Sequence, residues 1–212
     1  TCNISPVERS GAAQGLAEVG LVLGTARFDH ILSTVMPFHT STKNEAREGI
    51  MWFLSFLPVV LKEQYAKYAE LTLPLVLHCL ADDYDNVREI AYKAGLGCVT
   101  LSCNTAVSRG SEMSAAQAYT HDLIPLLLGG CADNNHYRTR LSSVNLMGEL
   151  LYKIGGGYST SSANRDTTGA SFEENSLSAS ASRLFSNIRS FINNEPTTDK
   201  IFSVLYISRH DV

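Results

Sequence analysis

The segment LPLVLHCLADDYDNVREIAYKAGLGCV, residues 73–99, contains two apolar stretches separated by an acidic break. The stretch from Leu73 to Leu80 is almost entirely apolar, and apolar side chains recur at steps of three and four from Val87 to Cys98. This spacing predicts two helices, because it places the apolar residues on one face of each. The break from Asp82 to Asn86 offers oxygens that cap the second helix and acidic charge that suits its positive end. We therefore expect a pair of helices joined by a short turn.

The same pattern returns in LIPLLLGGCADNNHYRTRLSSVNLMGELLYKIGG, residues 123–156, and weaker copies occur earlier in the chain. Each copy has an arginine at the start of its second helix, and successive arginines are separated by 38, 41 and 52 residues. These residues are Arg9, Arg47, Arg88 and Arg140. Periods of about 40 to 47 residues with two helices per unit are typical of HEAT and armadillo arrays. The sequence thus predicts an all-α fold, a right-handed α-α superhelix formed by a HEAT-repeat solenoid of the armadillo-like class.

The whole chain, residues 1–212, is expected to form one repeat array. Two polar and aperiodic stretches interrupt it, and we expect both to be loops: 104–119, which accounts for the long third interval, and 157–182, which is rich in glycine, serine and threonine. The predicted units are a partial one at each end and three complete ones between them: 1–24, 28–62, 66–103, 120–155 and 183–212.

The recurring arginines have two interpretations. In the structural one, each arginine pairs with an acid in the turn of its own or the adjacent repeat, so that Arg88 pairs with Asp82 or Asp133. Such a ladder would fix how the repeats stack, and its members are Arg9, Arg47, Arg88, Arg140, Asp82 and Asp133. In the other interpretation the arginines contact a partner protein. We expect the structural role.

The last apolar stripe of the chain lies just before the point where a further second helix should begin. Its residues are Ile201, Phe202, Leu205 and Tyr206. Leaving four such side chains in water forfeits roughly 6 to 12 kcal/mol. We therefore expect this face to be an interface that packs on a second copy of the chain, in a crystal or as a homo-oligomer, or on a neighbouring loop.

The composition excludes several classes of protein. A formal net charge of -4 and a pI near 5.8 lack the basic excess of a nucleic-acid binder, so direct binding of RNA or DNA is not expected. There is no apolar run long enough to span a membrane and no signal peptide, and the missing initiator methionine is typical of an excised piece. The five cysteines form no C-x-x-C pair, which favours small core residues in a reducing compartment.

No motif of catalysis, cofactor binding or metal binding is present. The chain has no phosphate-binding loop with its lysine, no nucleophile elbow and no H-E-x-x-H, and its six histidines include no pair at i and i+4. We therefore assign no catalytic, cofactor-binding or metal-binding residue, and expect no enzyme activity. Trp52, Phe53 and Phe56 have helical spacing and are interpreted as core residues, not as a ligand cage.

Two strings, RSGAAQGLAEV at residues 9–19 and RLSSVNLMGELL at residues 140–151, resemble the central HEAT array of the general-control translational activators. These very large eukaryotic scaffolds activate the starvation kinase of initiation factor 2 alpha. The resemblance implies a non-catalytic, cytoplasmic scaffold whose parent protein contacts ribosomes, an ABC-type ATPase partner and the kinase, without a cofactor. No partner-contact residue is transferred by it.

Two other functions remain open from the sequence. One is a HEAT adaptor for nuclear transport, phosphatase assembly or the cytoskeleton, although turns rich in acids and amides disfavour tubulin binding. The other is a helical hydrolase with an unrecognised site, which would need a pocket with convergent polar groups.

Overall fold

The structure is a computed structural model that describes residues 4–107, 115–133, 136–154, 186 and 195–208. Within these residues the secondary structure is helical and contains no strand. The elements are α1 (Pro6–Val22), α2 (Thr25–Val35), η1 (Met36–Thr40), α3 (Asn44–Leu61), η2 (Lys62–Tyr65), α4 (Ala66–Cys79), α5 (Asp85–Val107), α6 (Ala115–Cys131), α7 (Tyr137–Ile154) and α9 (Glu195–Ser208).

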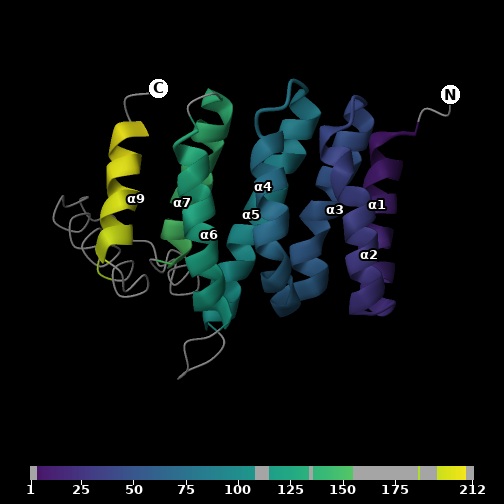
Figure 1. Ribbon diagram of the computed structural model, residues 1–212, viewed down its shortest axis with the longest axis horizontal. Helices are drawn as coiled ribbons and strands as arrows, with labels where there is room; N and C mark the ends of the chain where they lie inside the picture. Colours follow the sequence, from purple (N-terminus) through teal and green to yellow (C-terminus); the bar gives the residue numbers. More distant parts are fainter. Residues whose placement is uncertain (1–3, 108–114, 134–135, 155–185, 187–194, 209–212) are drawn as a thin grey trace, which may run out of the picture.

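The helices stand side by side in chain order, from α1 and α2 at one end of the molecule to α9 at the other (Figure 1). The second helices of the predicted units, α1, α3, α5 and α7, each pack against the next one along the chain. The first helices behave similarly, since α4 packs on α6 and α6 on α9. Because each helix contacts mainly its neighbours in the series, the fold is an all-α helical repeat solenoid, as the sequence predicts. The handedness of its superhelix stays a prediction.

Local chemistry explains where the helices begin. Ser5 caps α1 through a capping box: its hydroxyl accepts a hydrogen bond from the backbone amide of Glu8, and the Glu8 carboxylate accepts one from the backbone amide of Ser5. In the turn before α5, the Asp82 carboxylate accepts the amide of Tyr84 at 3.0 Å. Asp133 does the same for the amide of His136 at 3.2 Å before α7. The acidic turns thus satisfy amides that have no partner inside the helix.

One continuous apolar core runs along the stack from Ala13 in α1 to Ile201 in α9. At the α2 end, the Phe28 ring lies 6.5 Å from the Phe53 ring and 5.1 Å from the Tyr68 ring, which joins α2 to α3 and α4. Full burial of side chains of this size stabilises the fold by about 1.5 to 3 kcal/mol each. The stack therefore derives its cohesion from the junctions between successive helices.

A buried hydrogen-bond cluster lies inside this core. The Tyr65 hydroxyl, which is fully buried, lies 2.7 Å from the Thr72 hydroxyl and 3.1 Å from the Cys98 sulfur, so η2, α4 and α5 are joined. Burial raises the pKa of Tyr65 well above its ordinary value, and the neighbouring Cys98 raises it further. The tyrosine is therefore neutral at physiological pH, and its hydroxyl has a structural role.

The expected loop at 104–119 is corrected at both ends. Helix α5 continues to Val107 and α6 begins at Ala115, so both ends of the expected loop are helical, and residues 108–114 lie outside the described residues. Alanine-rich sequence such as AAQAY at 115–119 favours helix even where no apolar periodicity predicts one. The expected loop at 157–182 lies outside the described residues, and the exact bounds of the repeats stay predictions.

Candidate functional site

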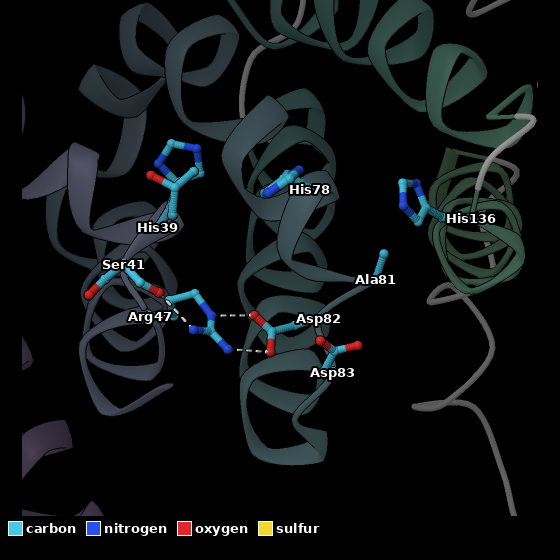
Figure 2. Close-up of a pocket in the computed structure, with 9 residues that line it drawn as sticks. His39, Ser41, Arg47, His78, Ala81, Asp82, Asp83 and His136 are labelled. Carbon is cyan, nitrogen blue, oxygen red and sulfur yellow. Dashed lines mark hydrogen bonds and ion pairs between the residues drawn. The ribbon is translucent and has the colours of Figure 1, made fainter. Parts of the chain in front are cut away.

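Arg47 connects two successive repeats at the edge formed by the turns. Its guanidinium donates to both carboxylate oxygens of Asp82, with Nε 2.6 Å from Oδ2 and Nη2 2.9 Å from Oδ1. The third nitrogen, Nη1, donates to the backbone oxygen of Ser41 at 2.7 Å (Figure 2). Arg47 lies in the first turn of α3, whereas Asp82 lies in the turn between α4 and α5. The pair therefore spans a repeat junction in the two-pronged geometry that suits a guanidinium.

Both side chains of this pair are nearly covered, with 14% of Arg47 and 7% of Asp82 exposed. Burial acts to raise the pKa of Asp82, but hydrogen bonds from Arg47 and from the Tyr84 amide, together with the charges of Arg47 and Arg88, outweigh it. The pKa of Asp82 therefore lies below its ordinary value, and the hydrogen bond to Asp82 raises that of Arg47. The contact is an ion pair at neutral pH.

Arg9 makes the corresponding contact one junction earlier, but with a residue that the sequence did not single out. Its Nη2 lies 2.8 Å from Oε2 of Glu48 in α3, and Glu48 is only 4% exposed. Oε1 of Glu48 also accepts the indole N–H of Trp52 at 3.3 Å. Glu48 follows Arg47 directly in the sequence, and no comparable buried acid adjoins the other ladder arginines, so the sequence pattern gave no signal for this contact.

Arg88 and Arg140 behave differently from the expectation. Arg88 donates to the backbone oxygen of Asp82 and pairs with the carboxylate of Asp85. The Asp82 carboxylate is already taken by Arg47, which corrects the expected pairing of Arg88 with it. Arg140 donates to the backbone oxygen of Asp133 at 2.9 Å. Two of the arginines thus bridge repeats and two contact their own turn, and the role of the ladder in fixing the stack stays a prediction.

A polar recess of about 440 Å³ lies beside the Arg47–Asp82 pair on the turn edge (Figure 2). Three histidines from three successive turns or helix ends line it: His39, His78 and His136. The rings of His39 and His78 lie 5.6 Å apart, edge to face, and Nδ1 of His39 is bonded to the Met36 oxygen at 2.8 Å. Among the described residues, no group of histidine, cysteine and acidic side chains is arranged to hold a metal ion.

A second hollow, of about 470 Å³, lies on the layer of second helices between α3 and α5, and we name it the Trp52 groove. Trp52 and Glu48 form its α3 side, and Pro6 of α1 lies at its edge. The α5 side consists of Asn86, Glu89, Ile90, Tyr92, Lys93 and Leu96. The groove places aromatic side chains, which are enriched at protein interfaces, beside two carboxylates.

The interpretation of the aromatic residues in α3 holds only in part. Phe53 is 2% exposed and belongs to the core, as expected. Trp52 and Phe56 are half-buried and stack on each other with ring centres 6.0 Å apart. Since side chains one residue apart point about 100° apart on a helix, Trp52 reaches the surface while Phe53 points inward.

The stripe at the C-terminal helix is largely covered within the chain. Ile201 is 1% exposed, because α9 packs on α6 and α7, so it is not part of an open interface. Phe202 and Leu205 are half-buried, and Tyr206 is 65% exposed. An interface with a second copy stays a prediction that Tyr206 and its half-buried neighbours would have to carry.

Burial makes the thiols of two described cysteines unreactive. Cys79, Cys98 and Cys131 are buried. Burial raises the pKa of Cys79 to about 12, with a further contribution from Asp82, and burial raises that of Cys131 to about 11. Since the thiolate is the nucleophile, these two groups are inert at neutral pH. None of the described helices is both long and apolar enough to cross a membrane.

Comparison with known proteins identifies relatives of the chain. It is 38% identical over 149 residues to the eIF-2-alpha kinase activator GCN1 of Saccharomyces cerevisiae, covering 70% of the chain and 5% of the relative. It is 35% identical over 150 residues to the protein of that name from Dictyostelium discoideum, covering 71% and 5%. It is 32% identical over 156 residues to the stalled ribosome sensor GCN1 of Homo sapiens, covering 72% and 5%.

No protein-family model matches the chain, and no solved structure matches it. The chain spans about 5% of the length of the relatives above. The activities of the whole relatives therefore cannot be assigned to this chain by similarity alone. The similarity nevertheless extends over about 70% of the chain in yeast, slime mould and human proteins, and it accompanies a helical repeat fold. The chain therefore belongs to the GCN1 family of eIF-2-alpha kinase activators and stalled ribosome sensors, of which it matches one segment.

Proposed function

We propose that the chain is a non-catalytic scaffold segment of a translational activator that links stalled ribosomes to activation of the starvation-responsive kinase of initiation factor 2 alpha. The observation that carries this proposal is the 32% to 38% identity to relatives whose names denote kinase activation and the sensing of stalled ribosomes. We further propose that the parent protein is cytoplasmic and has the kinase, an ABC-type ATPase and the ribosome as partners.

The geometry supports a scaffold more than a catalyst. Binding surfaces of solenoids extend over several repeats, and the two hollows described above lie across repeat junctions. The Trp52 groove carries two aromatic side chains, those of Trp52 and Tyr92, and aromatic residues are enriched at protein interfaces. The arginines that bridge repeats would hold these surfaces in a fixed relation.

A segment exchange in the yeast relative tests the proposal. The matching segment of the Saccharomyces cerevisiae protein is replaced by this chain, deleted, or replaced by an unrelated helical solenoid of equal length. Phosphorylation of initiation factor 2 alpha during amino-acid starvation and cosedimentation with ribosomes are then measured. We expect the exchange to preserve both readouts and the deletion to abolish the phosphorylation.

The unrelated solenoid separates a binding role from a spacer role. If it restores phosphorylation as well as this chain does, the segment acts as a spacer and the proposed contacts are wrong. Undiminished phosphorylation in the deletion variant would refute the proposal altogether.

A further inference from the structure

The Trp52 groove contains an aromatic face that already attracts a positive charge. The ammonium of Lys93 lies 4.5 Å from the centre of the Trp52 ring. Phe56 stacks on Trp52 at 6.0 Å, and the indole N–H is held by Glu48, so the ring has a fixed orientation. A cation over an indole face gains about 0.5 to 1 kcal/mol at an exposed site. The ring is therefore a prepared surface for a cationic group.

Because Lys93 lies over Trp52, it does not form an ion pair with the acidic residue Glu89. Glu89 and Lys93 stand four residues apart on α5, the spacing at which an acid and a base pair along a helix. Lys93 lies over Trp52 instead, and no base of the described residues forms an ion pair with Glu89, which is exposed and lines the groove. The groove thus holds a carboxylate that is free to pair with an incoming cation.

A second carboxylate, that of Glu149 in α7, acts on Tyr92, which lines the groove. Burial raises the pKa of Tyr92, and the charge of Glu149 raises it further. Among the described residues, no base forms an ion pair with Glu149 either. Glu48 deeper in the groove is neutralised by Arg9 at 2.8 Å. The charges that remain along the groove are those of Glu89 and of Lys93, which lies over Trp52.

We propose that the Trp52 groove binds an arginine-bearing apolar segment of a partner protein, with the guanidinium stacked on Trp52 in place of Lys93 and paired with Glu89. This proposal deepens the scaffold function proposed above, on which it depends for the existence of a protein partner. Arginine suits the site better than lysine, because its planar guanidinium stacks on an aromatic ring and pairs with a carboxylate at once. The apolar part of the segment would lie against Leu96 and the edge of Trp52.

A pair of synthetic peptides provides the test with the full chain. One is a short capped leucine–alanine peptide with a single central arginine, and the other carries citrulline, which has nearly the same shape without the charge, at that position. Trp52 is the only tryptophan of the chain, so its emission reports on the groove directly. We expect the arginine peptide to change this emission and to bind about 5- to 30-fold more tightly than the citrulline peptide, as an exposed ion pair and a cation–π contact together imply.

Three variants, compared by anisotropy of the labelled arginine peptide, locate the contact. Glu89→Gln should weaken binding about 5-fold, and Lys93→Met should strengthen it about 2- to 5-fold because the competing ammonium is gone. Glu70→Gln, which removes an exposed carboxylate from α4 in the other layer, should leave it unchanged. Equal binding of the two peptides, an unchanged Trp52 emission, or a weaker affinity in Lys93→Met would overturn the proposal. The outcome is independent of the yeast segment exchange, since no ribosome or kinase is present.

Discussion

Removal of the Arg47–Asp82 contact tests whether a single ion pair holds one repeat junction. An exposed pair is worth about 0 to 1 kcal/mol, whereas breaking a buried pair costs about 3 to 5 kcal/mol because the remaining charge loses its partner. With 14% and 7% of the side chains exposed, the pair lies closer to the buried case. The Asp82 carboxylate would, however, keep the Tyr84 amide at 3.0 Å. We therefore expect Arg47→Ala to lower the free energy of unfolding by about 2 to 3 kcal/mol.

A double-mutant cycle isolates the contact itself. Arg47→Ala, Asp82→Ala and the double variant are unfolded in urea and followed by far-UV circular dichroism. We expect a coupling free energy of about 2 kcal/mol at neutral pH, since neither single variant leaves the pair intact. Asp83→Ala serves as a matched control, because this neighbouring carboxylate is exposed and should change stability by less than about 0.5 kcal/mol.

The same cycle has a defined dependence on pH. The folded-state pKa of Asp82 is lowered, so its contribution is fully present above the unfolded value of about 3.9 and is lost as the pH falls through the folded value. The coupling should therefore stay constant from neutral pH to mildly acidic pH and decline only below about 4. A coupling smaller than about 0.5 kcal/mol at neutral pH would refute the assignment of Arg47 as a link between repeats.

Four further predictions concern the core. Gly130→Ala would place a methyl group 2.3 Å from Ser143 Oγ and should lower the free energy of unfolding in urea by about 1 to 3 kcal/mol. Adding Ser143→Ala should restore part of this loss. If the effects of the two substitutions are simply additive, the close approach of α6 and α7 is contradicted. Ser143→Ala alone should be neutral or slightly stabilising, because this buried hydroxyl has no hydrogen-bond partner among the described residues. Tyr65→Phe should cost about 1 kcal/mol by thermal unfolding, since it loses the bond to Thr72, and no change would mean that the buried cluster contributes nothing. Cys79 and Cys131, whose pKa values are raised to about 12 and about 11, should resist a thiol reagent at mildly alkaline pH until the chain unfolds, and rapid labelling of the folded protein would contradict their burial.

The pattern of residues 73–99 was sufficient to predict the helix pairs, because apolar periodicity and acidic turn chemistry act locally and agree with each other. The ends of α5 and α6 were missed, because helix propensity extends a helix beyond the last residue that packs in a periodic way. Which acid each arginine meets was also beyond sequence reasoning. The pairing depends on how far each repeat is shifted relative to the next, which only the tertiary structure determines. In the fold, Arg47 pairs with Asp82 and Arg88 pairs with Asp85.

The candidate surfaces, too, could be predicted only in part from the sequence. The arginine positions followed from the repeat, whereas the Trp52 groove could not be inferred, because helical spacing alone does not say which side of α3 faces α5. Trp52 and Phe53 are adjacent aromatic residues in the sequence, but Trp52 is half-buried whereas Phe53 is only 2% exposed. Likewise the recess lined by His39, His78 and His136 brings together residues that are far apart in the chain and form no motif.

The packing of each second helix on the next one, from α1 through α3 and α5 to α7, has a mechanical consequence. In such an array the curvature is the sum of small rotations, one for each junction. A tilt too slight to break any single contact, including the bridge between Arg47 and Asp82, therefore adds to the tilts at the other junctions. The array can thus change its curvature while every individual repeat keeps its shape.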